Sequence, residues 1–381
     1  MTTEARPYIG GQAVLEGVMM RSPASFAVVV RRKDGSLHVR ERVMVSARKG
    51  LGKLPFFRGV ASLVESLRLG NEALRFSAEL MQKDYDEEQG PKPKGSAVSS
   101  IMNVVRALGL QLFWLATEQG DGGAPAKKEG RGVGPMLVLM VAFLIALPQL
   151  TAAGIMKVAH VDWGVTSVRF QALTGAVKLT IVLGYLLLIR RMPDIRRVFQ
   201  YHGAEHKTIS TYEAREPLDV EHARAKTTLH ARCGTTFLVM IVLISILLFS
   251  ALGAVIPPIA TGSRLLDNVL FFLVKIPSLP LLAAVTFEIQ RVFAKYCVTG
   301  PLRVLLVPGF LVQRITTIEP DESQLEVALA SLRATLFRES GTAGEGGDAV
   351  FPSYAAIAQA PSLRGRAASP SAARERSHAS T

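Results

Sequence analysis

The sequence predicts a mainly α-helical, polytopic membrane protein with about four transmembrane helices and a small N-terminal α+β element, a β-hairpin plus a helix, in the cytoplasm. Hydrophobic residues make up 49% of the 381 positions and are gathered in long blocks, as is typical of membrane proteins. The blocks 136–156 and 235–260 contain no charged residue. Each is long enough to cross about 30 Å of hydrocarbon as a helix.

Two further blocks are also long enough to span a membrane. They cover 170–189 and 268–287, and each contains one lysine, Lys178 and Lys275 respectively. A charge at that depth either reaches toward the membrane surface or serves a function, and the sequence leaves both interpretations open. We therefore expect four spans.

The distribution of basic residues predicts the orientation. The segment 191–234 is rich in arginine and lysine, whereas the connections 157–169 and 261–267 contain only Lys157, Arg169 and Arg264. By the positive-inside rule, 191–234 and both termini are cytoplasmic, and we expect a multi-pass protein of the bacterial cytoplasmic (inner) membrane. The net charge of +13 is then explained by contact with anionic lipid headgroups. No nucleic-acid partner is expected, because the basic residues are spread over loops.

The N-terminal 1–81 contains the soluble elements. Alternating apolar residues in 26–46, on both sides of Asp34-Gly35, predict a β-hairpin. The following segment, up to about residue 80, has apolar residues at helical spacing. This helix either packs on the hairpin, which we favour because a hairpin needs a cover, or lies on the membrane surface.

The remaining boundaries follow from composition. The expected units are linkers at 82–134 with an interfacial helix near 98–116, transmembrane helices at 135–190, the cytoplasmic loop 191–234, transmembrane helices at 235–290, a cytoplasmic segment 291–338 with a helix at 321–337, and a disordered tail at 339–381.

The cytoplasmic loop contains the pattern H-x-x-E-H, formed by His202, Glu205 and His206. In a helix, residues four apart lie on the same face, so the two imidazoles can hold one cation. In metalloproteases with this pattern the histidines bind zinc and the glutamate is the base that activates water. The alternative is that both histidines are polar residues of a basic helix at the headgroup level.

Further ligands are expected on the same side of the membrane. His230 and Cys233 lie just before the third span, and Glu288 ends the fourth. A set of nitrogen and sulfur ligands favours Zn(II). Each residue also has a simpler interpretation: Cys233 as a small buried apolar residue, and Glu288 as the partner of Arg291, one helical turn away.

Several segments together resemble one family. The segments YIGGQAVLEGVMMRSP, RGVASLVESLRLG, FQYHGAEHKTISTYE, TLHARCGTTFL, TFEIQR and PGFLVQRITTIEPDESQLEVALASL are similar to those of the YqhQ-like family, also called domain of unknown function 1385. The resemblance runs from about residue 8 to 337. It implies a bacterial multi-pass membrane protein described as a metal-dependent enzyme, with motif residues at His202, Glu205, His206, His230, Cys233 and Glu288. Phe287 stands where the family has tyrosine.

Three functions are consistent with these features. The first is a cytoplasm-facing metal-dependent hydrolase with Zn(II), in which Glu205 is the general base. The second is a non-catalytic membrane scaffold or assembly factor, in which the histidine and cysteine cluster is structural. The third, a transporter that uses Lys178 and Lys275, fits poorly because no internal repeat is evident. The sequence leaves open whether the protein is an enzyme and what its substrate is.

Overall fold

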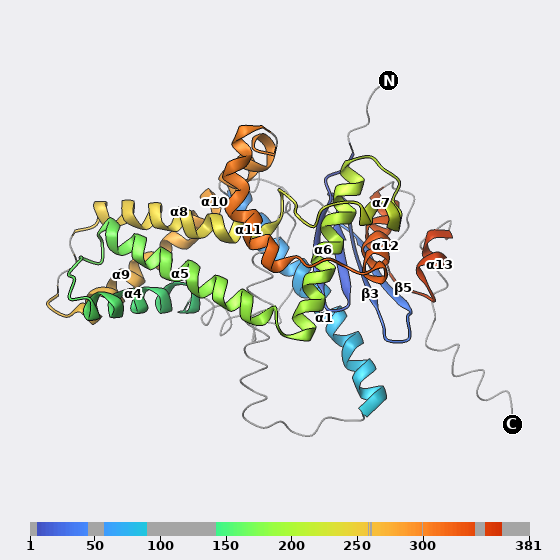
Figure 1. The fold of residues 1–381 in the computed structure, drawn as a ribbon, viewed down its shortest axis with the longest axis horizontal. Helices are drawn as coiled ribbons and strands as arrows, with labels where there is room; N and C mark the ends of the chain where they lie inside the picture. Colours follow the sequence, from blue (N-terminus) through green and yellow to red (C-terminus); the bar gives the residue numbers. More distant parts are fainter. Residues whose placement is uncertain are drawn as a thin grey trace.

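The computed structural model describes residues 6–44, 57–89, 142–257, 259, 261–298, 300–339 and 347–359. Within these residues the chain is mostly helical, with one small antiparallel sheet. Figure 1 shows two parts side by side: a long arm of helices, and a part in which the sheet lies between helices. We call them the arm and the sheet domain.

The sheet has five strands in the order β1-β2-β3-β4-β5, and each neighbouring pair is antiparallel. The strands are β1 (Gly10–Val14), β2 (Gly17–Arg21), β3 (Ser25–Arg31), β4 (Leu37–Val43) and β5 (Asp348–Phe351). The predicted hairpin is confirmed, because β3 and β4 pair on either side of a turn in which Gly35 has a φ of 84°, a conformation that favours glycine.

Helices cover both faces of the sheet. One face packs against α1 (Phe57–Gln89), which contributes Leu69, Ala73, Phe76 and Leu80 to an apolar cluster. The amphipathic helix thus packs on the sheet, as favoured above. The other face packs against α6 (Pro193–Glu213) and α12 (Glu322–Glu339). The helix α12 lies where the C-terminal helix is predicted.

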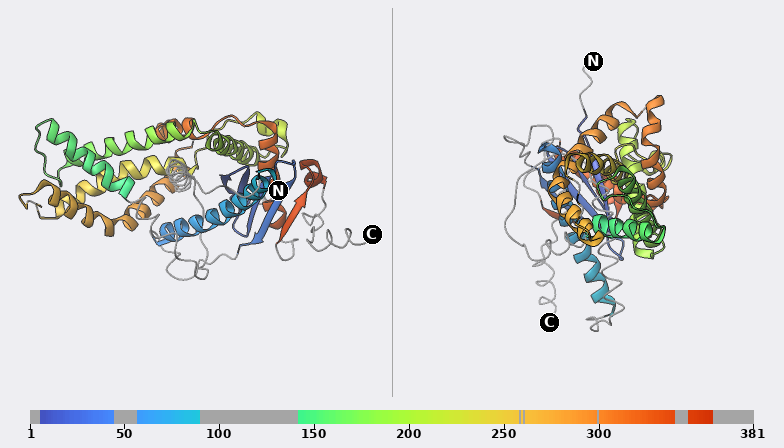
Figure 2. Two further views of the ribbon diagram at one scale, coloured as in Figure 1. Left: turned by 90° about the horizontal axis from the view of Figure 1, so that it is seen from below. Right: turned by 90° about the vertical axis from the view of Figure 1, so that its left-hand side faces the viewer.

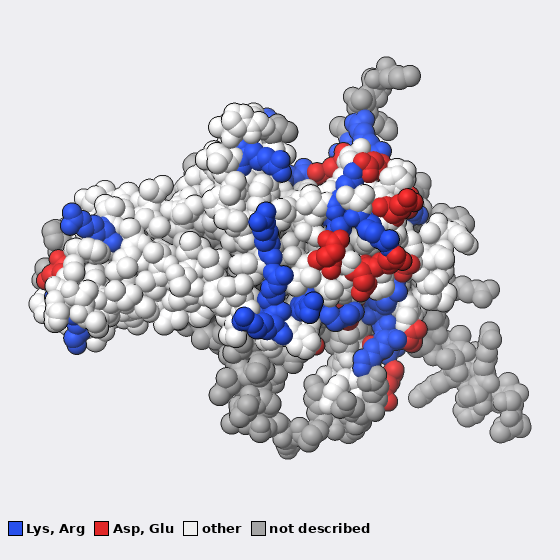
Figure 3. Space-filling view, viewed as in Figure 1, with Lys and Arg blue, Asp and Glu red and all other residues white. Residues whose placement is uncertain are grey.

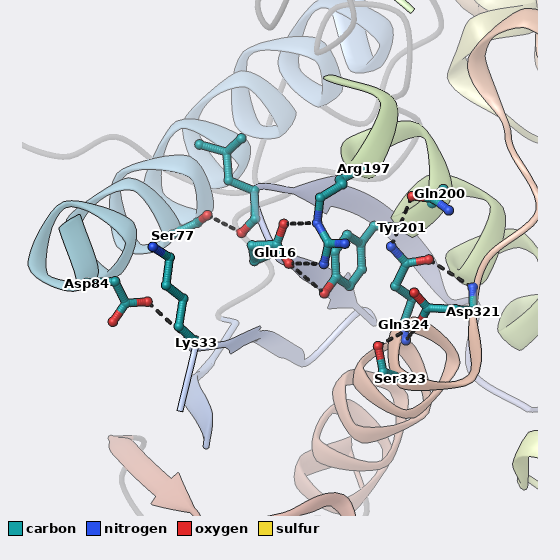
Figure 4. Close-up of polar contacts among 11 residues, drawn as sticks. Glu16, Lys33, Ser77, Asp84, Arg197, Gln200, Tyr201, Asp321, Ser323 and Gln324 are labelled. Atoms are coloured by element: carbon teal, nitrogen blue, oxygen red, sulfur yellow. Dashed lines mark hydrogen bonds and ion pairs between the residues drawn. The ribbon is translucent and has the colours of Figure 1, made fainter. Parts of the chain in front are cut away.

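Polar contacts fix α6 against the turn between β1 and β2. Arg197 makes an ion pair with Glu16, and the Tyr201 hydroxyl donates to the same carboxylate at 3.2 Å. Figure 4 shows these side chains converging from α6 on the turn, with Gln200 and Gln324 meeting nearby at 3.4 Å. The position of α6, which carries the H-x-x-E-H pattern, is therefore set by the sheet.

The arm consists of apolar helices. They are η2 (Ala142–Ala146), α4 (Leu147–Val158), α5 (Val168–Ile189), α8 (Gly234–Val255), α9 (Arg264–Lys275), η3 (Ile276–Ser278) and α10 (Leu279–Tyr296). Figure 2 shows the arm projecting to one side of the sheet domain in a second view. Figure 3 shows a surface nearly free of charge between the tip of the arm and the sheet domain. Leu188 of α5 and Leu247 of α8 are 58% and 71% exposed, which suits contact with lipid.

Three helices are long and apolar enough to cross a membrane: Val168–Ile189, Gly234–Val255 and Arg264–Phe293. We predicted four spans. The first, 136–156, is described only from residue 142, and its described part is the shorter apolar helix Phe143–Val158. The part of the chain that the structure describes therefore supports three spans, not four.

Lys178 and Lys275 are buried inside the arm. The Lys178 ammonium donates to the Ser245 hydroxyl at 3.3 Å, and the Lys275 ammonium donates to the Gln149 side-chain oxygen at 2.7 Å. They lie 5.8 and 4.9 Å from the ring centre of the same residue, Phe249. Lys178 is 8% and Lys275 1% exposed, and these partners inside the arm favour a functional buried charge over a lysine that reaches the membrane surface.

Two expectations for the segments outside the arm need correction. The helix α1 continues to Gln89, so the linker expected from residue 82 begins later. The tail expected to be disordered contains β5, which pairs with β4, and α13 (Tyr354–Gln359), whose Ile357 is buried. The predicted interfacial helix near 98–116 and the linker at 117–134 lie outside the described residues.

Candidate metal centre

Two histidines on α6 form the first half of the site. Pro193 occupies the first turn of α6, where proline is well tolerated because its missing N–H would be unpaired there. His202 and His206 follow on one face, with ring centres 4.4 Å apart, and each is 1% exposed. The four-residue spacing thus brings two imidazoles together in the protein interior.

The third ligand comes from the start of the arm. Cys233 is the N-cap of α8, and its sulfur accepts from the Thr235 backbone N–H at 3.4 Å. The sulfur lies 3.3 Å from Nε2 of His202. His202, His206 and Cys233 each offer one ligand atom, and these three atoms lie within 4.8 Å of one another. In a tetrahedral zinc site, neighbouring nitrogen and sulfur ligands are about 3.5 Å apart.

Main-chain carbonyls fix the tautomer of both histidines. Nδ1 of His202 lies 2.9 Å from the Thr316 carbonyl oxygen, and Nδ1 of His206 lies 2.5 Å from that of Thr228. A carbonyl oxygen only accepts, so each Nδ1 is the donor. Each Nε2 of the neutral ring is then the acceptor nitrogen, and that of His202 faces the Cys233 sulfur. Histidine ligands of metals are usually oriented in this way.

Burial holds the three groups uncharged when no cation is near. It lowers the pKa of His202 to about 4 and that of His206 well below its ordinary value, and it raises the pKa of Cys233 to about 12. Neutral imidazoles are the form that binds a metal, whereas the thiol must lose its proton. The donor set, its oriented lone pairs and its spacing therefore fit a zinc-sized cation.

Glu205 lies beside the cluster but is not one of its three ligands. A Cβ atom added to Gly11 would come within 2.7 Å of the Glu205 side chain, so the carboxyl group packs directly against β1. Its Oε2 atom is buried without a hydrogen-bond partner, and burial raises its pKa well above the ordinary value. A buried carboxylate with an unused oxygen next to these ligands is suited to accept a proton or to join a metal.

His230 borders the cluster. Its ring centre is 5.6 Å from that of His206, and its Nε2 is 3.3 Å from a carboxylate oxygen of Glu213. Gln313 holds its main chain by accepting from the His230 N–H at 2.9 Å and donating to the His230 carbonyl at 2.8 Å. His230 is thus next to the three ligands but is turned toward Glu213.

Glu288 is not brought into the cluster. It lies half-buried on α10, outside the group of ligand atoms formed by His202, His206 and Cys233. Two residues further along α10, Gln290 donates from its side chain to the Cys233 carbonyl at 3.2 Å. The end of this helix therefore supports the cysteine through its main chain.

A cavity of about 330 Å³ reaches His230 from the protein surface. Two of its lining residues come from η4 (Pro301–Leu306) and α11 (Val307–Thr316). Besides His230, the cavity is lined by Glu213, Leu229, Ala231, Arg232, Val298, Arg303 and Phe310. His230 separates this cavity from the three ligands, which are not among its lining residues.

Some of the supporting groups leave no trace in a sequence. The carbonyls of Thr228 and Thr316 are main-chain atoms that any residue could supply. Gln290 and Gln313 are isolated glutamines in apolar segments, which is the signal that could have revealed them, because a buried amide needs partners. Gly11 is a further supporting residue, because its lack of a side chain lets β1 approach Glu205 closely.

Fold and site define a mainly helical protein with three helices able to cross a membrane and a buried cluster of histidine and cysteine at the base of its apolar arm. The family model described as "Protein of unknown function (DUF1385)" matches residues 54–338, and the chain belongs to this family. It is also similar to "Uncharacterized protein YqhQ" of Bacillus subtilis (strain 168), with 28% identity over 339 residues, which cover 88% of this chain and 94% of that protein. No solved structure matches the chain.

Proposed function

We propose that the protein is a metal-dependent hydrolase of the bacterial cytoplasmic membrane, with Zn(II) held by His202, His206 and Cys233 on the cytoplasmic side. The observation that carries the proposal is the orientation of the histidines: both Nδ1 atoms donate to main-chain carbonyls, and Nε2 of His202 lies 3.3 Å from the Cys233 sulfur. This orientation aims the acceptor nitrogen of His202 at the third candidate ligand, which is the arrangement of histidines that are held as metal ligands by outer hydrogen bonds.

Glu205 is the general base in this proposal. A bound zinc ion supplies Lewis-acid activation of water in sites of this kind. Glu205, whose Oε2 is unpartnered and whose pKa is raised by burial, accepts the proton and later returns it to the leaving group. Gly11 holds the carboxyl group in place by its close contact. Substrate enters the cavity that ends at His230, and the His230 side chain moves aside to admit it to the centre.

The membrane location is part of the proposal. Its support is the apolar surface of the arm together with the basic residues that gather at its base. We propose that both termini and the sheet domain are cytoplasmic, that the tip of the arm faces outward, and that anionic lipid headgroups contact the base. The salt bridge between Asp162 and Arg264 lies at the tip, as expected for a segment outside the hydrocarbon.

The experiment that tests the hydrolase proposal compares the zinc-loaded protein with Glu205→Gln. A panel of chromogenic phosphate esters, carboxylic esters and peptides is offered to both. The parent should hydrolyse one class and lose that activity on chelation, and the variant should keep its zinc but lose at least 99% of the rate, an effect of about 100-fold or more for a general base. Loss of zinc in the variant would contradict the assignment of Glu205 as the base.

A non-catalytic scaffold is the second candidate, and the burial of the three ligands favours it. In that case His230 would turn from Glu213 to close a four-ligand structural site, as in other closed zinc sites. His230→Ala separates the two candidates. The hydrolase proposal expects zinc to remain bound with three protein ligands, whereas a closed structural site would lose it.

A further inference from the structure

A second cavity lies away from the metal centre, where the arm meets the sheet domain. It has a volume of about 500 Å³ and is lined by Leu187, Arg190, Arg191, Arg196 and Ile318. Arg190 and Arg191 follow the end of α5, and Arg196 lies in the first turn of α6. The change of direction between these two helices therefore gathers three guanidinium groups around one space.

Among the residues that the structure describes, no carboxylate pairs with an arginine of this cavity. Arg190 donates to the main-chain carbonyls of Arg314 and Ile315 at 2.6 and 3.0 Å, which fixes the side chain but leaves its charge uncompensated. Arg191 and Arg196 form no ion pair with any other residue that the structure describes. Asp194, in the same turn, does not line the cavity.

The next arginine behaves differently. Arg197 is one position further along α6, and its Nε and Nη2 groups donate to the two oxygens of the Glu16 carboxylate. That arginine is used to attach α6 to the sheet. The three that line the cavity remain available to an anion from outside the protein.

The apolar wall of the cavity continues onto the surface of the arm. Leu187 is 46% exposed and Leu188, next to it on α5, is 58% exposed. Figure 3 shows basic side chains in a band between the nearly uncharged arm and the sheet domain. A ligand with an anionic head in the cavity and an apolar part along α5 would match both surfaces.

We propose that this cavity binds the phosphate group of an anionic phospholipid, in the leaflet that faces the sheet domain. The inference rests on the membrane location given under the proposed function, but not on the metal centre. Arg190 is held in position by the two carbonyls, while Arg191 and Arg196 donate charge-assisted hydrogen bonds to the phosphate oxygens, a pairing that arginine makes strongly. The acyl chains extend past Leu187.

Such a lipid would act on the rest of the protein through α6. The cavity is built on the turn between α5 and α6, and α6 carries His202 and His206 further along the same helix. A bound phosphate, with its one negative charge, would weaken the repulsion among the three like charges across this turn. The lipid would thus fix the angle at which α6 leaves the membrane.

The test measures the affinity of the delipidated full-length protein, purified in detergent, for soluble short-chain phosphatidylglycerol. Short-chain phosphatidylcholine and inorganic phosphate are titrated in parallel. The variant is the double substitution Arg191→Gln with Arg196→Gln. The control is Arg169→Gln with Arg291→Gln, which removes two exposed charges that likewise form no ion pair with a described residue. Arg291 lies near the base of the arm and Arg169 near its tip.

We expect the variant to bind phosphatidylglycerol about 100-fold more weakly than the parent, since it loses two charge-assisted bonds and each contributes about a factor of ten in affinity. The control should bind as the parent does. Equal weakening in variant and control would overturn the site, because it would show attraction to basic residues in general. If inorganic phosphate bound as tightly as the lipid, through the same arginines, the proposal of a lipid ligand would be overturned. The ligand would then be free phosphate.

The lipid titration is repeated after a chelator has removed any bound metal, which separates the lipid site from the metal centre. Unchanged lipid affinity supports the inference whatever the fate of the hydrolase proposal. An unchanged thermal unfolding transition in the arginine variant shows that it is folded, so weaker lipid binding there cannot be attributed to unfolding.

Discussion

His202 and Cys233 meet where α6 and α8 approach each other at the base of the arm: Nε2 of His202 lies 3.3 Å from the Cys233 sulfur, although 31 positions separate them. The contact joins the sheet domain, which positions α6, to the first residue of an apolar helix. A cation bound there would connect the two parts of the protein.

Replacing Cys233 tests this contact through a spectroscopic signature. The protein loaded with Co(II) in place of zinc should show a near-ultraviolet band from sulfur-to-cobalt charge transfer. We expect Cys233→Ser to lose that band, because oxygen gives no such transition, and Cys297→Ser to keep it, because Cys297 is not one of the clustered ligands. An unchanged band in Cys233→Ser would show that the sulfur does not bind the cation.

Any side chain at residue 11 should clash with the Glu205 side chain in its present position. A Cβ atom at residue 11 would lie 2.7 to 2.8 Å from three atoms of Glu205. Gly11→Ala should therefore lower the free energy of unfolding by about 1–3 kcal/mol, as overpacking does, measured by denaturant or thermal unfolding. Gly164→Ala is the control, because nothing lies within 4 Å of its added Cβ. In a Glu205→Ala background the effect of Gly11→Ala should shrink; an undiminished effect would contradict this contact.

The metal-free protein should lose stability in mild acid. Burial lowers the pKa of His230 to about 4 from its ordinary value of 6.5, and it lowers the pKa of His202 to about 4 as well. Between these two pH values the unfolded chain binds a proton that the folded chain does not, so acidification favours unfolding. The free energy of unfolding should fall as the pH drops from about 6.5 to about 4, and less steeply in His230→Asn. Identical slopes for parent and variant would show that His230 is not buried as described.

The orientation of the arm can be checked with single cysteines in intact cells. Ala159 is exposed in the turn after α4 and Ala358 is exposed on α13, so both accept a thiol without disturbing packing. A membrane-impermeant thiol reagent should label Ala159→Cys from outside and Ala358→Cys only after lysis. The native Cys233 and Cys297 are buried and should give little background. Labelling of Ala358→Cys in intact cells would contradict the proposed topology.

The sequence predicted the elements whose signal is local. The alternation around Asp34-Gly35 indicated the β3–β4 hairpin, and the histidine spacing on a helix indicated the pair His202 and His206. It missed β1 and β2, because GGQAVLEGVMM reads as glycine turns rather than as alternating strands. It also missed β5, which has only four residues and depends on β4, about 310 positions away along the chain, for its hydrogen bonds.

The same distinction applies to the candidate site. Proximity of Cys233 to the histidines was expected from topology, and the structure brings them together. The choice between His230, Cys233 and Glu288 as further ligands depended on how α6, α8 and α10 pack, which local patterns do not encode. The carbonyls of Thr316 and Thr228 that orient the imidazoles come from loops fixed by that packing.

The most direct test of the metal centre is the metal content per chain of the protein purified in detergent, measured by elemental mass spectrometry. Three proteins are compared: the parent, His206→Ala, and His222→Ala as a control histidine that pairs with Asp219 on the short helix α7 (Val220–Arg224). The proposal expects about one zinc ion per chain in the parent and in His222→Ala, and little in His206→Ala. Folded parent protein without metal, or equal metal in all three, would contradict it.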